Sequence, residues 1–358
     1  MPEFKFGDNL KIKVIGVGSL GSNCLEHLKS LDKRGLTRIA VGLPSKGLAR
    51  AEAHKKIVFD PEKRFVSEDD MNEEWGRSLL SKHSQDISNE LAGADIAFVV
   101  GSLGREINYL AMEHIANIAR NVGVVTFGVA TKPFFFEGKK RQDMANVFSD
   151  NLKQSIDSLL IIPNDTLIKD GLAAEEALTM TDKTVGDCIG SLLEIVFTVG
   201  NINIDFNDFK ATIERSGAAF LGMAEGERKK LDSLLKRATT NLFFELPFKS
   251  AKRVLYLVTA SKELTLDELR RVGDFLASKS DREAKIIFGL AVDNKLDNKI
   301  KLTLLGCGVE DGESKEPSTL SENIKEASHQ KNEINIEANE KSEMDVPAFL
   351  RRKMEKEE

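Results

Sequence analysis

The sequence predicts an α/β protein built on a doubly wound parallel sheet, and two features carry that prediction. From residue 11 to residue 163, short apolar runs rich in β-branched residues alternate with amphipathic segments. Continuous apolar runs are typical of strands covered on both faces, and their alternation with helices indicates a parallel sheet between two helical layers. A second α/β pattern follows beyond residue 200, so we expect two domains in this chain of 358 residues.

Strands and helices are expected in a regular order along the chain. The runs that we interpret as strands are 11–17, 38–43, 95–100, 124–130 and 158–163 in the first region, and 253–260, 284–292 and 300–308 in the second. Helical periodicity marks 139–157, a long segment at 174–199, and 265–278. We therefore expect a first α/β domain (1–171), a central helix (172–199), a second α/β domain (200–309), a disordered polar linker (310–343) and a terminal peptide (344–358).

Composition excludes several classes of function. A net charge of −6 gives no electrostatic reason to expect a nucleic-acid partner. No run approaches 18 apolar residues and the first residues do not read as a signal peptide, so we expect no membrane span. Cys24, Cys188 and Cys307 lie far apart without a neighbouring His cluster, which fits a reducing cytoplasm and no metal site.

A glycine-rich turn follows the first expected strand. Gly16, Gly18 and Gly21 form a GxGxxG array between that strand and the next helix, which is the dinucleotide-binding fingerprint. A dinucleotide site also needs an acidic residue at the end of the second strand, and residues 42–45 (GLPS) include none. An NAD-dependent enzyme is therefore the weakest of the functions that we consider.

Three longer motifs resemble the FtsZ family, the bacterial and archaeal homologues of tubulin. They are TFGVATKPFFFEGKKR at 126–141, LLIIPND at 159–165 and GNINIDFNDFK at 200–210, in the family's order. The resemblance covers about residues 10–309 and extends to the last peptide, MDVPAFLRR. It implies a tubulin/FtsZ-like fold whose first domain is GTPase-like, and a filament-forming protein of cell division.

The resemblance also implies a set of nucleotide-binding residues. Those that it assigns to GTP are Gly18, Gly21, Ser22, Asn23, Gly104, Glu137, Arg141, Asn164 and Asp182. Glu137 would hold the ribose and Arg141 would lie along the nucleotide, whereas considered by themselves these two residues, four apart, indicate a surface helix pair. Asn164 and Asp182 would meet the guanine edge, whose N1–H and amino group both donate hydrogen bonds. Mg²⁺ is expected to accompany GTP.

A second implied set of residues belongs to the opposite end of the subunit. Asn203, Asp205 and Asp208 would form the synergy loop, which enters the nucleotide site of the next subunit in a filament. Two carboxylates three residues apart can polarise a water molecule against a γ-phosphate, which is general-base positioning supplied in trans. Considered by themselves, Asp205 and Asp208 would equally serve as caps of the helix expected near Phe209.

The phosphate-binding loops depart from the family pattern. Residues 104–110 (GREINYL) stand where the family has GGGTG[ST]G, so one glycine of five remains. Side chains obstruct a loop that works through bare backbone N–H groups. Residues 59–70 replace a further glycine-rich loop, and Leu178 stands in place of the aromatic residue that stacks on the base. We therefore expect weakened GTP binding, with Arg105 and Glu106 paired as fillers.

Three functions remain open at this point. The first is a divergent FtsZ that assembles with itself or with another FtsZ while binding and hydrolysing GTP weakly. The second is an ordinary FtsZ GTPase with an unusual pocket, and the third is the NAD-dependent enzyme. Under the first two we expect a cytoplasmic protein at the division site, with filament partners and no nucleic acid.

An apolar and basic cluster closes the chain. The residues that we expect to bind a partner there are Val346, Phe349, Leu350, Arg351 and Arg352. Apolar anchors with flanking charges on a flexible tether are typical of a docking peptide. In the family, the terminal peptide binds a membrane-anchoring division protein, and we expect the same kind of partner here.

Phe349→Ala should abolish recruitment to the membrane anchor, because this side chain supplies the largest apolar group of the peptide. Midcell fluorescence of the tagged protein measures recruitment, and thermal melting should show an unchanged globular part. Asn332→Ala, in the polar linker, is the matched control. Midcell localisation that persists in the Phe349 variant would contradict docking.

Overall fold

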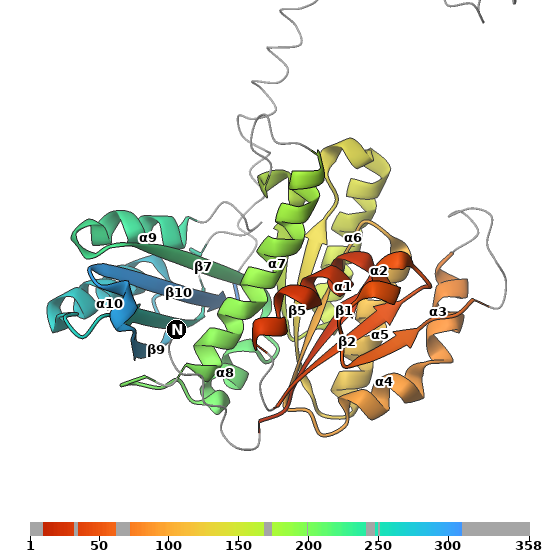
Figure 1. Cartoon of the computed structure of the whole chain (residues 1–358), viewed down its shortest axis with the longest axis horizontal. Helices are drawn as coiled ribbons and strands as arrows, with labels where there is room; N and C mark the ends of the chain where they lie inside the picture. Colours follow the sequence, from red (N-terminus) through yellow and green to blue (C-terminus); the bar gives the residue numbers. More distant parts are fainter. Residues whose placement is uncertain are drawn as a thin grey trace, which may run out of the picture. The chain divides into compact units, whose positions relative to one another are not determined.

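The described residues form a ten-stranded sheet with the order β3-β2-β1-β4-β5-β6-β7-β10-β8-β9 (Figure 1). The computed structural model describes residues 10–31, 35–61, 72–167, 174–198, 200–240, 248–249 and 251–309. All of them belong to one compact unit. The expected linker (310–343) and terminal peptide (344–358) lie outside the described residues.

The first half of the sheet is parallel, as the sequence predicts. Its strands are β1 (Ile12–Val17), β2 (Leu36–Gly42), β3 (Lys55–Val58), β4 (Ile96–Ser102), β5 (Val125–Lys132) and β6 (Ser158–Pro163). Five of them match expected strands, whereas β3 was not expected. Because only Ile57 of its four residues is buried, no apolar run marks β3 in the sequence.

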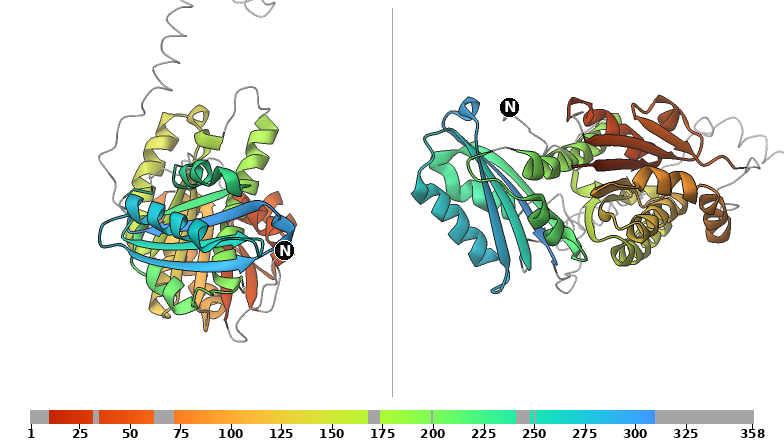
Figure 2. Two further views of the ribbon diagram at one scale, coloured as in Figure 1. Left: turned by 90° about the vertical axis from the view of Figure 1, so that its left-hand side faces the viewer. Right: turned by 90° about the horizontal axis from the view of Figure 1, so that it is seen from below.

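Helices cover both faces of this parallel half (Figure 2). They are α1 (Gly18–His27), α2 (Lys46–Arg50), α3 (Glu73–Ser81), α4 (Ser84–Leu91), α5 (Glu106–Asn121), α6 (Lys139–Ser155) and α7 (Ala174–Phe197). Within β1, Ile12 and Val14 pack on the side of α1 and α7, while Ile15 and Val17 pack on the side of α3 to α6. Alternating strand residues therefore fill two separate cores, which is the doubly wound arrangement.

The second half of the sheet is mixed. Its elements are α8 (Phe206–Ile213), β7 (Gly217–Glu227), α9 (Leu231–Thr239), β8 (Arg253–Ala260), α10 (Leu266–Lys279), β9 (Lys285–Val292) and β10 (Lys299–Cys307). β10 is antiparallel to β7 and β8, while β8 and β9 are parallel. β7 also pairs with β6 through Ser158–Gly217 and Leu159–Ala218. Hydrogen-bonded pairing thus continues from the first expected domain into the second.

The strand order reverses between β1 and β4. β1 lies beside both β2 and β4, so the chain winds outward in two directions from this point. In open α/β sheets, the crevice at the carboxyl ends of the strands flanking such a reversal is where ligands bind. The helices that follow these two strands, α1 and α5, begin at this crevice.

Two glycines allow α1 to approach the sheet closely. A Cβ on Gly16 would lie 2.3 Å from the carbonyl oxygen of Gly21, and a Cβ on Gly21 would lie 2.5 Å from that of Val100. Both neighbours are backbone atoms, which cannot turn aside as a side chain can. The start of α1 is therefore fixed against β1 and β4 by the absence of side chains.

Gly16→Ala should destabilise the protein by about 1–3 kcal/mol, because the added methyl group forces α1 away from β1. Urea unfolding followed by circular dichroism measures the loss. Gly190→Ala on α7 is the control, since its Cβ would make an ordinary 3.6 Å contact with Leu31. A loss no larger than that of the control would contradict the close-approach argument.

Candidate functional site

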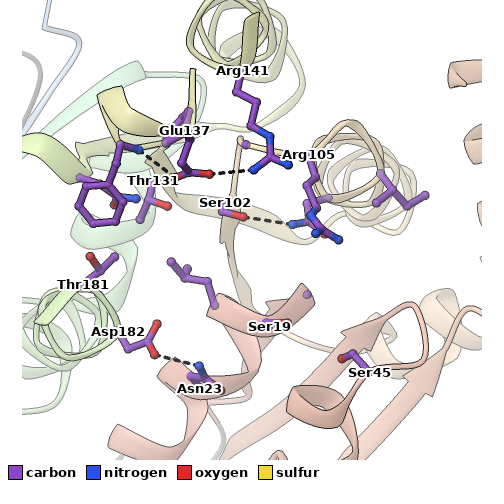
Figure 3. A pocket seen from close by; sticks show the side chains of 18 of the residues that line it. Ser19, Asn23, Ser45, Ser102, Arg105, Thr131, Glu137, Arg141, Thr181 and Asp182 are labelled. Atoms are coloured by element: carbon purple, nitrogen blue, oxygen red, sulfur yellow. Dashed lines mark hydrogen bonds and ion pairs between the residues drawn. The ribbon is translucent and has the colours of Figure 1, made fainter. Parts of the chain in front are cut away.

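A cavity of about 700 Å³ opens at the carboxyl edge of the parallel strands (Figure 3). Its walls come from the segments that follow β1, β2, β4, β5 and β6 and from the N-terminal half of α7. The lining residues are Gly18, Ser19, Leu20, Asn23, Leu43, Pro44, Ser45, Ser102, Gly104, Arg105, Ile107, Asn108, Thr131, Pro133, Phe134, Glu137, Arg141, Asn164, Thr181 and Asp182.

One side of the cavity holds a carboxylate fixed by an amide. Asn23 on α1 donates a hydrogen bond from Nδ2 to Oδ2 of Asp182 on α7, at 2.8 Å. Burial raises the pKa of Asp182, and the hydrogen bond from Asn23 partly offsets that rise. In the described part of the chain, the other carboxylate oxygen has no hydrogen-bond partner. It can therefore accept from a ligand that donates hydrogen bonds.

Two further oxygen atoms in the cavity wall lack hydrogen-bond partners among the described residues. Asn164 begins η4 (Asn164–Leu167) directly after β6 and is 7% exposed, and Thr131 of β5 is 0% exposed. The unpaired atoms are Oδ1 of Asn164 and Oγ1 of Thr131. A buried polar atom without a partner costs about 1–3 kcal/mol. Two such atoms in one cavity wall indicate a polar ligand that satisfies them.

The rim of the cavity carries an ion pair. Glu137, in η3 (Phe135–Glu137), lies 3.1 Å from Nη1 of Arg141 on α6 and accepts a 2.9 Å hydrogen bond from the backbone N–H of Phe134. The side chains of Glu137 and Arg141 are 27% and 37% exposed, and both line the cavity. The expected helix pair is therefore present, and it borders the cavity.

The start of α5 lies against the start of α1. Gly18 opens α1 with a φ of +69°, and a Cβ there would lie 2.8 Å from Oδ1 of Asn108 on α5. Nδ2 of Asn108 donates a 3.1 Å hydrogen bond to Oγ of Ser102 at the end of β4. Neither helix has a side-chain cap at its N-terminus. An amide side chain therefore fills the gap between two helix N-termini, which attract anions when open.

The described ranges give no support for a metal site or for a membrane-spanning helix. No group of three or more His, Cys, Asp or Glu side chains there is placed to hold a metal ion. None of the described helices is both long enough and apolar enough to cross a membrane.

Comparison with known proteins identifies the family. The tubulin/FtsZ family GTPase domain matches residues 11–171, and the FtsZ family C-terminal domain matches residues 217–310. The cell division protein FtsZ of Buchnera aphidicola is 27% identical, over 98% of both chains. A point mutant of FtsZ from M. jannaschii superposes with a TM-score of 0.74 at 28% identity, over 84% of this chain and 92% of that one.

The chain is an FtsZ-like member of the tubulin/FtsZ family. A second M. jannaschii structure, an empty FtsZ dimer, gives a TM-score of 0.72 at 27% identity and covers 84% of this chain and 89% of its own. The predicted fold class is thereby confirmed, and so is the resemblance on which it rested. The alternative of an NAD-dependent enzyme is not supported by any of these matches.

Most of the GTP-binding residues implied by the FtsZ resemblance meet at the cavity. Gly18, Asn23, Gly104, Glu137, Arg141, Asn164 and Asp182 line it. Gly21 and Ser22 do not: Gly21 packs against Gly16, and Ser22 is 1% exposed, with no hydrogen-bond partner for its hydroxyl among the described residues. Sequence reasoning missed Thr131, although a polar residue at the carboxyl end of a buried strand is a usable signal.

The replaced glycine loop of this FtsZ-like chain differs from the arrangement expected for it. Arg105 precedes α5 and lines the cavity. Glu106 begins α5 and lies toward α3: burial and Glu73 raise the pKa of its carboxyl group, while Arg77 lowers it. The structure thus explains Glu106 by α3 rather than by the expected pair with Arg105. Of the loop at 59–70 only residues 59–61 are described, and the side chain of Leu178 is not.

The predicted synergy-loop residues lie away from the cavity. Asn203, Asp205 and Asp208 follow the C-terminal end of α7 (Figure 1). That end lies about 22 Å along the helix from Asp182, at 1.5 Å per residue. Oδ1 of Asp205 accepts a 3.0 Å hydrogen bond from the backbone N–H of Asn207, so the helix-cap interpretation is confirmed for Asp205. Within one subunit, these carboxylates cannot reach the cavity.

Asp182→Asn should stabilise the folded protein at pH 7. The raised pKa of Asp182 means that its ionised form costs stability above that pKa, and the cost disappears as the pH falls below about 4, the unfolded value. An amide oxygen at this position can still accept from Asn23. Urea unfolding at pH 7 and pH 4 should show a gain at pH 7 that shrinks at pH 4.

Asp187→Asn provides the matched control for this measurement. Asp187 lies on the same helix with an exposed side chain, so its replacement removes one charge without relieving a buried one. A gain at Asp182 that is the same at both pH values, or the same as the control, would contradict the burial argument.

Proposed function

We propose that this protein is a subunit of cell-division filaments that binds guanine nucleotide weakly and joins filaments of another FtsZ. The observation that carries the proposal is the difference between the two ends of the subunit. The exposed carboxylates after α7 keep the family pattern, whereas side chains occupy the family's glycine loop beside the cavity. Support comes also from the family match and from relatives named cell division protein FtsZ.

The cavity suits a guanine base. The free oxygen of Asp182 can accept from the N1–H and amino group of guanine, both of which are donors. The unpaired Oδ1 of Asn164 offers another acceptor in the same wall. Glu137 at the rim would accept from ribose hydroxyls, and Arg141 beside it would offset the phosphate charge. These side chains would hold GTP, and bound GTP would supply the phosphate bond that a filament hydrolyses.

The carboxylates after α7 are placed to act on a neighbouring subunit. Asp205 is exposed, and Asp208 forms a 3.3 Å ion pair with Lys285 of β9, whose side chain is 62% exposed. Oδ1 of Asn203 accepts a 2.7 Å hydrogen bond from the backbone N–H of Gly200, which shapes the turn before them. A preformed turn that presents exposed carboxylates can enter another subunit's cavity without much loss of entropy.

Exposed apolar side chains at both ends support head-to-tail assembly. Phe135 and Phe136 are 65% and 62% exposed in η3, next to the cavity. Ile202 is 39% exposed beside the carboxylates after α7. Two different surfaces at opposite ends form a heterologous contact, which propagates into a filament rather than closing into a dimer.

The alternative of an ordinary FtsZ GTPase keeps one supporting observation, which is that most of the expected nucleotide-binding residues line the cavity. We favour the filament partner because the altered loop lies where phosphates would bind. Docking of the tail to a membrane-anchoring protein at the division site, and Mg²⁺ with the nucleotide, belong to the same proposal and rest on the family resemblance.

Substoichiometric mixing with a cognate FtsZ tests the proposal. The wild-type protein should stimulate GTP turnover by the cognate FtsZ and change filament length, seen by phosphate release and electron microscopy. A variant with Asp205→Asn and Asp208→Asn should lose the stimulation, because it loses both carboxylates. Asn also caps helices well, so this variant keeps the cap of α8 that alanine would remove.

Asp208 forms an ion pair with Lys285, whereas Asp205 caps α8. The double variant therefore also removes an ion pair, and that loss needs a control. Lys285→Gln removes the ion-pair partner of Asp208 while leaving both carboxylates in place. It should keep the stimulation. GTP-dependent polymers formed by the wild-type protein alone, at the turnover of an ordinary FtsZ, would overturn the proposal in favour of the ordinary GTPase.

A further inference from the structure

One side chain stands where the phosphates of a nucleotide would lie. Asn108 projects from the first turn of α5 toward Gly18, the first residue of α1, and a Cβ on Gly18 would come within 2.8–3.2 Å of three atoms of its carboxamide. A phosphate oxygen that accepts from both helix N-termini needs about 2.9 Å on each side. No such gap exists while the carboxamide lies against Gly18.

The position of Asn108 is fixed by a hydrogen bond. Its Nδ2 donates to Oγ of Ser102 at 3.1 Å, and both residues line the cavity. A phosphate that entered this gap would have to break that bond and displace the amide. Its carboxamide oxygen, which faces Gly18, is an acceptor and cannot bind a phosphate oxygen.

Four residues stand in place of glycines of the loop, and two of them, Arg105 and Asn108, line the cavity. Leu110 is 1% exposed and packs against α3, where a Cβ on Gly76 would lie 2.6 Å from Leu110 Cδ1. Glu106 also lies toward α3, where Glu73 and Arg77 act on its carboxyl group. Glu106 and Leu110 do not line the cavity, and Arg105 precedes α5, so Asn108 is the replacement that lies against Gly18.

We propose that Asn108 is the residue that sets how many phosphates this site accepts, and that it selects guanosine and its shorter phosphates against GTP. The inference rests on the proposed function, in which the cavity binds a guanine nucleotide. Asp182, paired with Asn23, holds the base on one side of the cavity, so the phosphate chain must extend toward α5. Each added phosphate meets the carboxamide more closely.

This selection follows from the balance of interactions at the two sides of the cavity. The carboxylate of Asp182 and the oxygen of Asn164 are available whatever the phosphate count. A terminal phosphate loses the hydrogen bonds to helix N–H groups that an open gap would provide, and each charge-assisted bond is worth about 1.5–3 kcal/mol. A site of this kind binds the nucleoside portion but has a lower affinity for the triphosphate.

Calorimetric titration of the full chain with guanosine, GMP, GDP and GTP, with Mg²⁺ present, tests the inference. The wild type should bind GTP more weakly than GDP or GMP. Asn108→Gly should strengthen GTP binding by about tenfold or more, which is the effect of one recovered hydrogen bond, and should leave guanosine binding unchanged. Asn108→Ala leaves α5 more stable than Asn108→Gly does, and it should shift the preference between GTP and the shorter nucleotides in the same direction.

Two controls make the result specific. Ser102→Ala frees the carboxamide of Asn108 and should weaken the discrimination against GTP without abolishing it. Asn89→Ala removes an exposed amide of α4, far in sequence from the loop, and should change nothing. Thermal melting by circular dichroism identifies any variant that fails to fold, and Asn108→Ala then replaces Asn108→Gly.

The outcomes separate this inference from the proposed function. Wild-type protein that binds GTP as tightly as GDP overturns the inference, and so do Asn108 variants that strengthen all four ligands equally. Guanosine binding that survives in either case leaves the proposed function standing. No binding of any of the four ligands by the wild type or the variants removes the nucleotide site, and both ideas fail together.

Discussion

The close approach of α1 to the sheet is the constraint on which the cavity depends. Gly16 and Gly21 meet with no side chain between them, and Gly21 also lies against the backbone of Val100. This contact places the start of α1 at the carboxyl end of β1, next to the reversal of strand order. It also sets Asn23 where it can reach α7. A methyl group at this contact would displace the start of α1, which carries Gly18 and Asn23 of the cavity wall.

The sequence predicted the strands that are buried on both faces, because a continuous apolar run is their direct consequence. β3 and β7 escaped prediction for physical reasons. Only Ile57 is buried in β3, and the last five residues of β7 are partly or fully exposed, so neither strand is an unbroken apolar run. The seam between the two halves was also beyond sequence reasoning, since β6 and β7 pair through only two residue pairs. Which strands pair across this seam depends on how the whole chain folds, and the local sequence of either strand does not indicate it.

The cavity shows a similar division between what motifs reveal and what they do not. Motif order led to Glu137, Arg141 and Asn164, because each belongs to a recognisable run, whereas Asp182 was assigned through the family resemblance alone. The replaced loop was recognised too, but the direction of each new side chain depends on where α5 begins. With Glu106 as the first helical residue, positions 106 and 110 share one helix face, and that face meets α3. Position 108 falls on another face and reaches Gly18. An alignment counts lost glycines, whereas helical phase decides which of the replacements within α5 faces the cavity.

The two sides of the cavity differ in whether their polar groups have partners within the protein. The side that would hold a base keeps costly features, namely the buried carboxyl of Asp182 and the unpaired oxygens of Asn164 and Thr131. Locally unfavourable groups of this kind are expected chiefly at functional sites. At the side of α5, by contrast, the amide of Asn108 has taken up the space between two helix N-termini and found its own partner in Ser102. In the proposed function the first side is the binding surface, whereas at the second side the amide of Asn108 already has a partner in Ser102. Under the proposed function, such a subunit would occupy a place in a filament, yet it would offer its neighbour's carboxylates no γ-phosphate to act on.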